Sequence, residues 1–289
     1  MLLDNYLLEE LVTFAQTGTL AATAAKLNVT QPTITRGMQK LEADLGVQLF
    51  EHQPNRLVLT KTGVLAAKEA TQLLEANRQA GNRIQNFDRT QRTGQISSVL
   101  PGPLMLLHHV QDTLSSITIR PTLLLEQNLL ATLTNNEDLI VISNQEFDTP
   151  TITSKYLGTE TLAVNLNQFM YQANQATISF KELTGLSFIV LDNIGPWRDV
   201  IQEGITDAKF FYQDQPDALA EITKQSKFPY FTSNLSVLDS QTVQRLHDDN
   251  RVQIPLTDQA AQMAVYASYL SSKKEQALPI IEQLVTNWP

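Results

Sequence analysis

The side chains best suited to recognising another molecule lie between residues 31 and 40. Gln31, Pro32, Thr33, Arg36 and Lys40 share one face of a helix expected there, because apolar residues recur at helical spacing on the other face. Glutamine can pair bidentately with adenine, threonine can contact thymine, and arginine can bind guanine or phosphate. Such a face fits a DNA major groove, but a solvated helix face is equally polar, so both interpretations stay open. The apolar residues are Ile34, Met38, Leu41 and Leu45.

Three short helices are expected in the first 46 residues, and their ends are marked by residue type. Each begins after a side chain that can cap free backbone N–H groups, and each ends at a residue that tolerates the left-handed conformation. The last two helices, joined by a tight turn, would form a helix-turn-helix. The expected caps are Asp4, Thr19 and Thr30, and the expected ends are Gly18, Asn28 and Gly46.

A hairpin and a long helix are expected next. Residues 49–59 alternate as strand, turn and strand, with the turn at 53–55 and Arg56 at the tip of this wing, where it would reach the sugar-phosphate backbone. Thr60 can cap a helix that runs to about Asn86, on the order of 40 Å at 1.5 Å per residue. A helix of this length between two domains is typical of a dimerisation and linker element.

The segment from Gly18 to Gly63 resembles the DNA-binding domain of LysR-type transcriptional regulators. The residues that carry the resemblance are Gly18-Thr19-Leu20, Ala24-Ala25, Leu27, Val29-Thr30-Gln31-Pro32, Thr35-Arg36, Leu41-Glu42, Leu45-Gly46, Leu49-Phe50 and Leu59-Thr60-Lys61-Thr62-Gly63. The resemblance implies a winged helix-turn-helix that binds double-stranded DNA as a homodimer or homotetramer and alters access for RNA polymerase. The residues assigned to DNA contact are Thr30, Gln31, Pro32, Thr33, Thr35, Arg36, Lys40 and Arg56.

Two positions depart from the family pattern. His52 stands where the family usually has Arg, so one phosphate contact would be weaker or pH-sensitive. Gly37 lies inside the recognition helix, where glycine costs about 1 kcal/mol relative to alanine. Residues 1–92 carry 10 Lys and Arg against 9 Asp and Glu. Together these features predict modest DNA affinity at physiological salt.

From about residue 93 short β-rich runs, such as 117–125, 139–142 and 188–191, alternate with helical stretches. This alternation is typical of an α/β domain, here expected to have mostly parallel sheets. The region also resembles the family's effector-binding domain, which is similar to periplasmic binding proteins and has two lobes joined by two crossover strands. The expected divisions are a DNA-binding domain at 1–60, a linker helix at 61–92 and an effector domain at 93–289, with lobe one at 93–164 and 267–289 and lobe two at 165–266.

Three loops that follow expected strands are candidates for binding a small-molecule effector, because ligands in such folds bind beyond the carboxyl ends of strands. Glycine and proline are also ordinary turn residues, and Trp197 could belong to the core. The family's first loop often has a hydroxyl group for an anionic effector. Prolines stand there in this chain, which favours a less polar ligand. The candidate contacts are Pro101, Gly102, Pro103, Asn193, Ile194, Trp197 and Thr232.

Composition limits the alternatives. The 289 residues carry a net charge of −9, and the acidic excess lies in residues 93–289. The absence of Cys excludes disulfides and thiolate metal sites. The N-terminus lacks a basic region followed by an apolar one, and no apolar run approaches the roughly 18–20 residues of a membrane span. We therefore expect a cytoplasmic protein without a membrane partner.

Catalytic motifs are also missing from the sequence. His108 and His109 are adjacent and cannot share a helix face, and His247 is isolated, so no metal-ligand spacing results. There is no glycine-rich phosphate loop and no nucleophile elbow. We expect neither an enzyme, nor a cofactor, nor a metal site. The alternative to a regulator is a sensor or interaction protein whose helix-turn-helix is degenerate and no longer binds DNA, although the intact Arg36 weighs against it.

Overall fold

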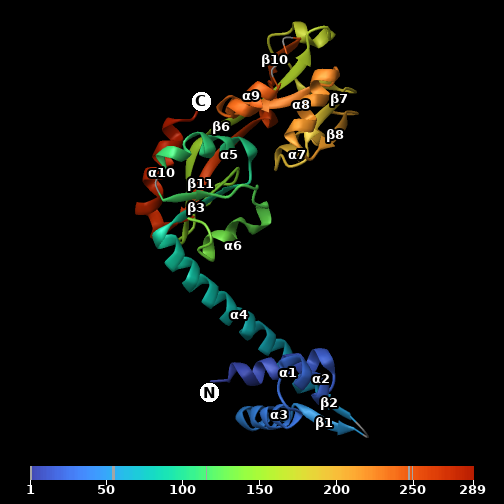
Figure 1. Ribbon diagram of the computed structural model, residues 1–289, viewed down its shortest axis with the longest axis vertical. Coiled ribbons are helices and arrows are strands. Elements are labelled where there is room, and N and C mark those ends of the chain that lie inside the picture. Colours follow the sequence, from blue (N-terminus) through green and yellow to red (C-terminus); the bar gives the residue numbers. More distant parts are fainter. Residues whose placement is uncertain (1, 54–55, 115, 247, 249) are drawn as a thin grey trace. The chain divides into compact units, whose positions relative to one another are not determined.

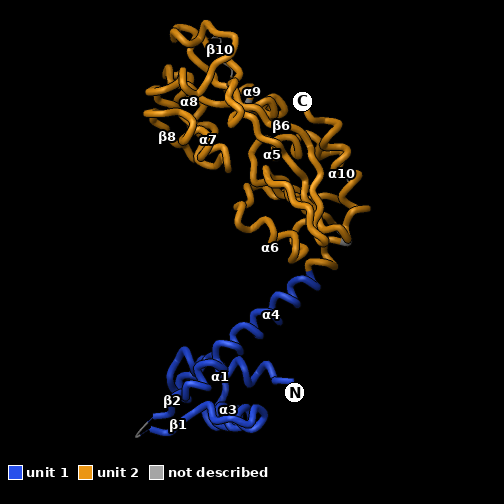
Figure 2. The backbone as a smooth tube through the Cα atoms, turned by 180° about the vertical axis from the view of Figure 1, so that it is seen from behind, with its two compact units in different colours: residues 1–85 blue, residues 86–289 orange. Residues whose placement is uncertain are grey.

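The computed structural model describes the chain except residues 1, 54, 55, 115, 247 and 249. It divides into two compact units, Met1–Gln85 and Asn86–Pro289, which Figure 2 shows in different colours. The long helix α4 belongs to both. The first unit contains α1 (Asn5–Thr17), α2 (Leu20–Leu27), α3 (Gln31–Leu45), β1 (Phe50–Gln53), β2 (Arg56–Leu59) and most of α4 (Lys61–Arg92).

The helix ends of the first unit follow the expected capping chemistry. The Asp4 carboxylate accepts the Tyr6 N–H at 2.9 Å, and the Thr19 hydroxyl accepts the Ala22 N–H at 3.2 Å. Gly18 and Asn28 adopt φ angles of 74° and 55°, which end α1 and α2. Thr30 occupies the capping position of α3, but its side chain makes no capping bond. The prediction that Thr30 precedes this helix is therefore confirmed, but the prediction that its side chain caps the helix is wrong.

One apolar cluster holds α1, α3 and the hairpin together. The rings of Phe14 and Phe50 meet edge to face with centroids 5.2 Å apart. The Glu42 carboxylate on α3 accepts the backbone N–H groups of Leu49 and Phe50 at 2.7 and 3.0 Å. Helix α3 and the hairpin are thus fixed to each other. The principal buried residues are Leu8, Leu11, Phe14, Ile34, Met38, Leu41, Leu49 and Phe50.

Two long strands run through the second unit. At one end they pair with each other in a sheet that contains three parallel strands, and at the other end only the longer of the two, β6 (Ile152–Asn167), pairs with two short strands (Figure 1). A separate parallel pair, β7 and β8, completes the strands that the structure describes in this unit. These strands are β3 (Gly94–Ser98), β4 (Ile117–Ile119), β5 (Ile140–Ser143), β6 (Ile152–Asn167), β7 (Ser187–Leu191), β8 (Lys209–Gln213), β9 (Tyr230–Ser233), β10 (Arg251–Pro255) and β11 (Gln262–Leu270).

Helices cover both parts of the second unit. α10 packs on β6 and β11, α5 on β3, and α8 on β7 and β8. The α-helices are α5 (Pro101–His109), α6 (Leu129–Thr134), α7 (Trp197–Gly204), α8 (Pro216–Gln225), α9 (Ser240–Leu246) and α10 (Lys274–Thr286). The 3₁₀ helices are η1 (Gln111–Thr113), η2 (Glu126–Asn128), η3 (Tyr171–Asn174), η4 (Phe180–Leu183), η5 (Asn234–Leu238), η6 (Gln259–Ala261) and η7 (Ser271–Lys273).

Three sequence-based expectations about these elements were wrong. The sheets are mixed rather than mostly parallel, because β6 and β11 pair antiparallel with each other and with their neighbours. The strand expected over 117–125 ends at Ile119, shortly before Pro121, which has no N–H to continue a ladder. Helix α4 continues to Arg92, beyond the expected end near Asn86.

Candidate functional site

The outer face of α3 is exposed. Gln31, Pro32, Thr33, Arg36 and Lys40 are all solvent-accessible, whereas the apolar stripe on the other side is buried. Within the part of the chain that the structure describes, neither Arg36 nor Lys40 has a salt-bridge partner. Both cations are therefore available to a phosphate or a base edge.

The remaining candidates for DNA contact lie at the ends of this face. The Thr30 and Thr33 hydroxyl groups are hydrogen-bonded to each other at 2.9 Å. Thr35 is half-buried and donates its hydroxyl to the Gln31 carbonyl oxygen at 3.1 Å. Arg56 is exposed at the start of β2, and its Nε donates to Gln53 at 2.9 Å. The expected turn includes residues 54 and 55, which lie outside the described residues.

The two positions that depart from the family pattern have different surroundings. His52 is exposed on β1 opposite Leu57, so it faces solvent on the wing. Gly37 is buried, and a Cβ atom there would overlap the carboxyl group of Glu10 on α1. Burial, and next the charge of Asp4, raise the pKa of Glu10. Gly37 is thus a packing position that lets α1 approach α3 closely.

A cavity of about 120 Å³ lies in the second unit, between the start of α5, the end of β7 and the start of β9. Six of the seven predicted effector contacts line it, although they come from three loops far apart in the sequence. Trp197 belongs both to the cavity wall and to the apolar core, so its expected place in the core is confirmed and its contact with an effector stays a prediction. Pro103 is buried and is not among the lining residues. The six are Pro101, Gly102, Asn193, Ile194, Trp197 and Thr232.

Glu160 on β6 also lines this cavity, and sequence reasoning missed it. The residue is 1% exposed, and its Oε2 has no hydrogen-bond partner among the described residues. Burial raises its pKa to about 7, while the nearby Ser233 hydroxyl and Trp197 indole act in the opposite direction. The sequence did contain a signal for its burial, because side chains alternate between the two faces of a strand. Every second residue after Glu160 is apolar and buried, which places Glu160 on the same buried face: Leu162, Val164 and Leu166.

The backbone on both sides of Glu160 is fixed by one amide. Asn234 accepts the Thr161 N–H at 2.9 Å and donates to the Thr159 carbonyl oxygen at 3.1 Å. Gly102 at the start of α5 closes the other side, because a Cβ atom there would overlap the Glu160 carboxyl group. The carboxyl group therefore has little freedom to turn away from the cavity.

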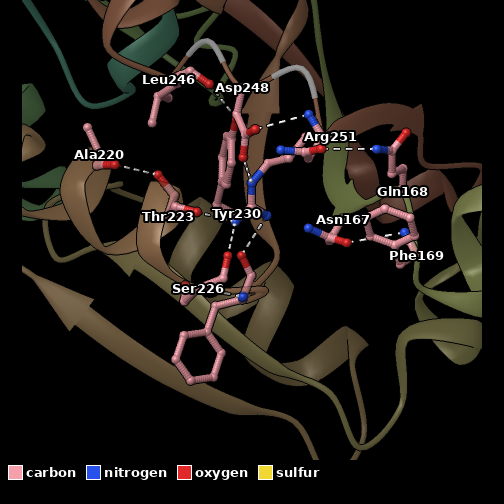
Figure 3. Close-up of polar contacts among 12 residues, drawn as sticks. Asn167, Gln168, Phe169, Ala220, Thr223, Ser226, Tyr230, Leu246, Asp248 and Arg251 are labelled. Atoms are coloured by element: carbon pink, nitrogen blue, oxygen red, sulfur yellow. Dashed lines mark hydrogen bonds and ion pairs between the residues drawn. The ribbon is translucent and has the colours of Figure 1, made fainter.

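The far wall of the cavity contains Tyr230, whose position is set by the polar cluster in Figure 3. The Tyr230 hydroxyl donates to the Leu246 carbonyl oxygen at 3.2 Å, and the Arg251 guanidinium lies 5.2 Å from the centre of its ring. Arg251 also donates to the carbonyl oxygens of Thr223, Ser226 and Phe228 at 2.6–2.9 Å. This cluster ties β10 to the α8–β9 connection.

No group of three or more His, Asp or Glu side chains that could hold a metal ion occurs among the described residues. His247 lies outside them. None of the described helices is both long enough and apolar enough to cross a membrane.

Comparisons with known proteins agree with this arrangement. Residues 6–64 match the family model described as "Bacterial regulatory helix-turn-helix protein, lysR family". The HTH-type transcriptional regulator TcbR of Pseudomonas sp. (strain P51) is 42% identical over 76 residues, 26% of each chain. DgcR of Pseudoalteromonas sp., also an HTH-type transcriptional regulator, is 24% identical over 203 residues, which cover 65% of this chain and 68% of that protein. The match to TcbR thus spans about a quarter of its length.

Solved structures share the fold over nearly the whole chain. DarR of Vibrio fischeri, solved in complex with DNA, has a TM-score of 0.62 at 16% identity, covering 97% of this chain and 99% of that one. Full-length OxyR C199D of Pseudomonas aeruginosa has a TM-score of 0.54 at 17% identity, covering 100% and 96%. Residues 6–64 thus match the helix-turn-helix domain of the LysR family, and the chain as a whole shares the fold of these solved structures.

Proposed function

We propose that this protein is a sequence-specific DNA-binding transcription regulator whose α3 lies in a major groove. The observation that carries the proposal is the exposed face of α3, with Gln31, Thr33, Arg36 and Lys40 free of the core. Glutamine and arginine at these positions can discriminate base edges, while Arg56 would contact the backbone. The named relatives TcbR and DgcR are transcriptional regulators, which supports the same role here.

The second unit is proposed to bind a small-molecule effector in the cavity described above. Its apolar walls, with a few polar groups converging on them, have the composition of a ligand pocket. The six predicted residues that line it, together with Glu160, are the proposed contacts. Pro103 is proposed to act by shaping the first turn of α5. No cofactor and no catalytic step are part of this proposal.

The active form is proposed to be a homodimer or homotetramer, acting in the cytoplasm and affecting access of RNA polymerase to a promoter. Leu65, Leu73 and Ile84 of α4 are 49–71% exposed. At 100° per residue they fall within one broad face, which also carries Ala76 and Ala80. An exposed apolar stripe on a helix favours pairing with a second helix. The division at 1–60, 61–92 and 93–289, with the two lobes, remains part of the proposal.

A second candidate is a sensor whose helix-turn-helix no longer binds DNA. The near-zero charge of residues 1–92 and the exposed His52 favour it. The free guanidinium of Arg36 favours DNA binding instead.

Selection of binding sites from random duplex DNA with the purified full chain separates the two candidates. We expect enrichment of an interrupted palindrome by the wild type and loss of that enrichment with Arg36→Ala. Arg78→Ala is the matched control, because it removes one exposed cation from α4 that is already paired with Glu75 at 2.7 Å. Failure to enrich any motif at low salt would favour the sensor.

A further inference from the structure

The cavity in the second unit contains a buried acid without a counter-ion. Glu160 Oε2 is buried and has no hydrogen-bond partner among the described residues. Burying a polar atom without a partner is costly, and a carboxylate costs more. Native structures rarely keep such atoms unless a water, an ion or a ligand completes them. The Ser233 hydroxyl and the Trp197 indole lie near the carboxyl group and lower its pKa, but both are neutral. Glu160 lines the cavity, so a counter-ion can come from a molecule bound there.

The charge of the lining determines which molecule fits. None of the described residues that line the cavity is Lys, Arg or His. The first turn of α5 could attract an anion, but Pro101 and Pro103 have no N–H to donate, and the Glu160 carboxyl group already lies against Gly102. A carboxylate ligand would therefore meet no cation in the described lining, and above about pH 7 it would also meet the like charge of Glu160.

We propose that the cavity binds a small, largely apolar amine as its ammonium ion, which donates a hydrogen bond to Glu160 Oε2. This inference rests on the proposed role of the cavity as the effector site. The ammonium charge would compensate the buried carboxylate. The alkyl part would contact apolar walls such as Leu162, Ile189 and Trp197. A cavity of about 120 Å³ suits a molecule of about five non-hydrogen atoms, since benzene, which has six, binds in an engineered cavity of roughly 150 Å³.

The proposal carries a specific dependence on pH. Burial raises the pKa of Glu160 to about 7, so the empty cavity holds mostly a neutral acid below that pH. An ammonium ion needs the carboxylate, so its binding at lower pH releases a proton. Affinity should rise with pH up to about 7 and then stay level until the amine itself loses its proton, near the pKa of about 10.4 of a lysine side chain.

Glu160 shares the cavity lining with one other titratable side chain among the described residues. From β9, Tyr230 lines the cavity, and burial raises its pKa further, so it stays neutral. Neighbouring elements carry charged or titratable side chains that are not among the lining residues. They include His108 and His109 of α5, Arg198, Asp199 and Glu203 of α7, and Asp217, Glu221 and Lys224 of α8.

The test is calorimetric titration of the full chain with n-butylamine, n-butanol and butanoate at pH 6 and pH 8. We expect binding of butylamine alone, about tenfold tighter at pH 8 because the carboxylate fraction of Glu160 rises by roughly that factor. Glu160→Gln should weaken butylamine binding at least tenfold and abolish its pH dependence, whereas Glu203→Gln should change neither.

Binding of butanoate, equal binding of butanol and butylamine, or unchanged binding to Glu160→Gln would overturn the proposal. The pH profile of the wild type needs no variant, so it stays decisive if Glu160→Gln folds poorly. The outcome is also distinct from that of the proposed function. If DNA selection enriches a motif but butylamine does not bind, only the proposal of an amine ligand is overturned. If butylamine binds but no motif is enriched, only the proposal of DNA binding is overturned.

Discussion

Glu160 and Arg251 are ionisable side chains of the second unit that are shielded from solvent but differ in the contacts that their charged groups make. Arg251 donates to three backbone carbonyl oxygens and lies 3.3 Å from Asp248. Glu160 keeps one carboxyl oxygen without a partner among the described residues. A cation with several hydrogen-bond partners and a nearby carboxylate stabilises the fold around it, whereas a buried acid without a counter-ion costs stability in the empty protein. The first is a structural residue and the second is a candidate for binding.

The first prediction concerns the stability contributed by Glu160. Its folded pKa of about 7 lies above its ordinary value of 4.5, so the folded state holds the proton more tightly. This contribution is fully present below pH 4.5 and is lost as pH rises to about 7. We compare the free energy of unfolding of Glu160→Gln with that of the wild type by urea unfolding. We expect the difference, variant minus wild type, to be larger at pH 8 than at pH 4.5 by on the order of 3 kcal/mol.

Glu203→Gln removes an exposed carboxylate of α7 and serves as the control. Its free energy of unfolding should differ from that of the wild type by the same amount at pH 4.5 and at pH 8. A difference between Glu160→Gln and wild type that does not change with pH would contradict the raised pKa.

Glu160 also shows why part of the site was missed. Its strand pattern was readable, but its importance depends on Gly102, Trp197 and Ser233, which the fold brings from three other elements. The predicted loops do meet at one cavity, because the rule that ligands bind beyond strand ends needs only the order of elements, and their contact with an effector stays a prediction. Contacts between side chains that are far apart in the chain cannot be predicted from the residues next to each of them in a single sequence.

At the scale of elements, the first unit was predictable because its signals are local. Asp4, Gly18, Thr19, Asn28 and Gly46 act within a few residues of themselves, and the structure confirms each. The strand order of the second unit was not predictable in this way. Pairing of β6 with β11 joins segments about 100 residues apart, and neither strand's own composition determines its direction.

The second prediction compares two glycines of α4. A Cβ atom at Gly63 would overlap the backbone carbonyl of Leu49, whereas Gly81 has no neighbouring atom within 4 Å. We expect Gly63→Ala to lower the free energy of unfolding by about 2–4 kcal/mol, because a backbone clash forces a shift in the packed core. Gly81→Ala should raise it by about 0.5–1 kcal/mol through helix propensity. Thermal unfolding followed by circular dichroism measures both, and a destabilising Gly81→Ala would contradict the packing described.

At the scale of the whole molecule, the exposed stripe on α4 needs a partner. Leu73 is 49% exposed and Ile84 is 71% exposed, although both are large apolar residues. Burying such side chains contributes about 1.5–3 kcal/mol each, so a second copy of the helix would be stabilised by covering them.

The third prediction follows from this stripe. We expect Leu73→Glu to convert a dimer into a monomer, because a charge would be buried in an apolar contact. Asn82→Glu introduces the same charge on the opposite side of the helix, where Asn82 is exposed, and should leave the dimer intact. Sedimentation velocity gives the mass of each variant. Equal masses for wild type and Leu73→Glu would show that α4 is not the contact.

The central claim, that α3 reads DNA sequence, is tested most directly by the affinity of the full chain for its selected duplex, measured by fluorescence anisotropy with Arg36→Ala and Arg78→Ala in parallel. Our account predicts that Arg36→Ala loses about 1–3 kcal/mol, roughly 5- to 150-fold, while Arg78→Ala stays close to wild type. Equal affinities for the wild type and Arg36→Ala, or equal losses in the two variants, would contradict it.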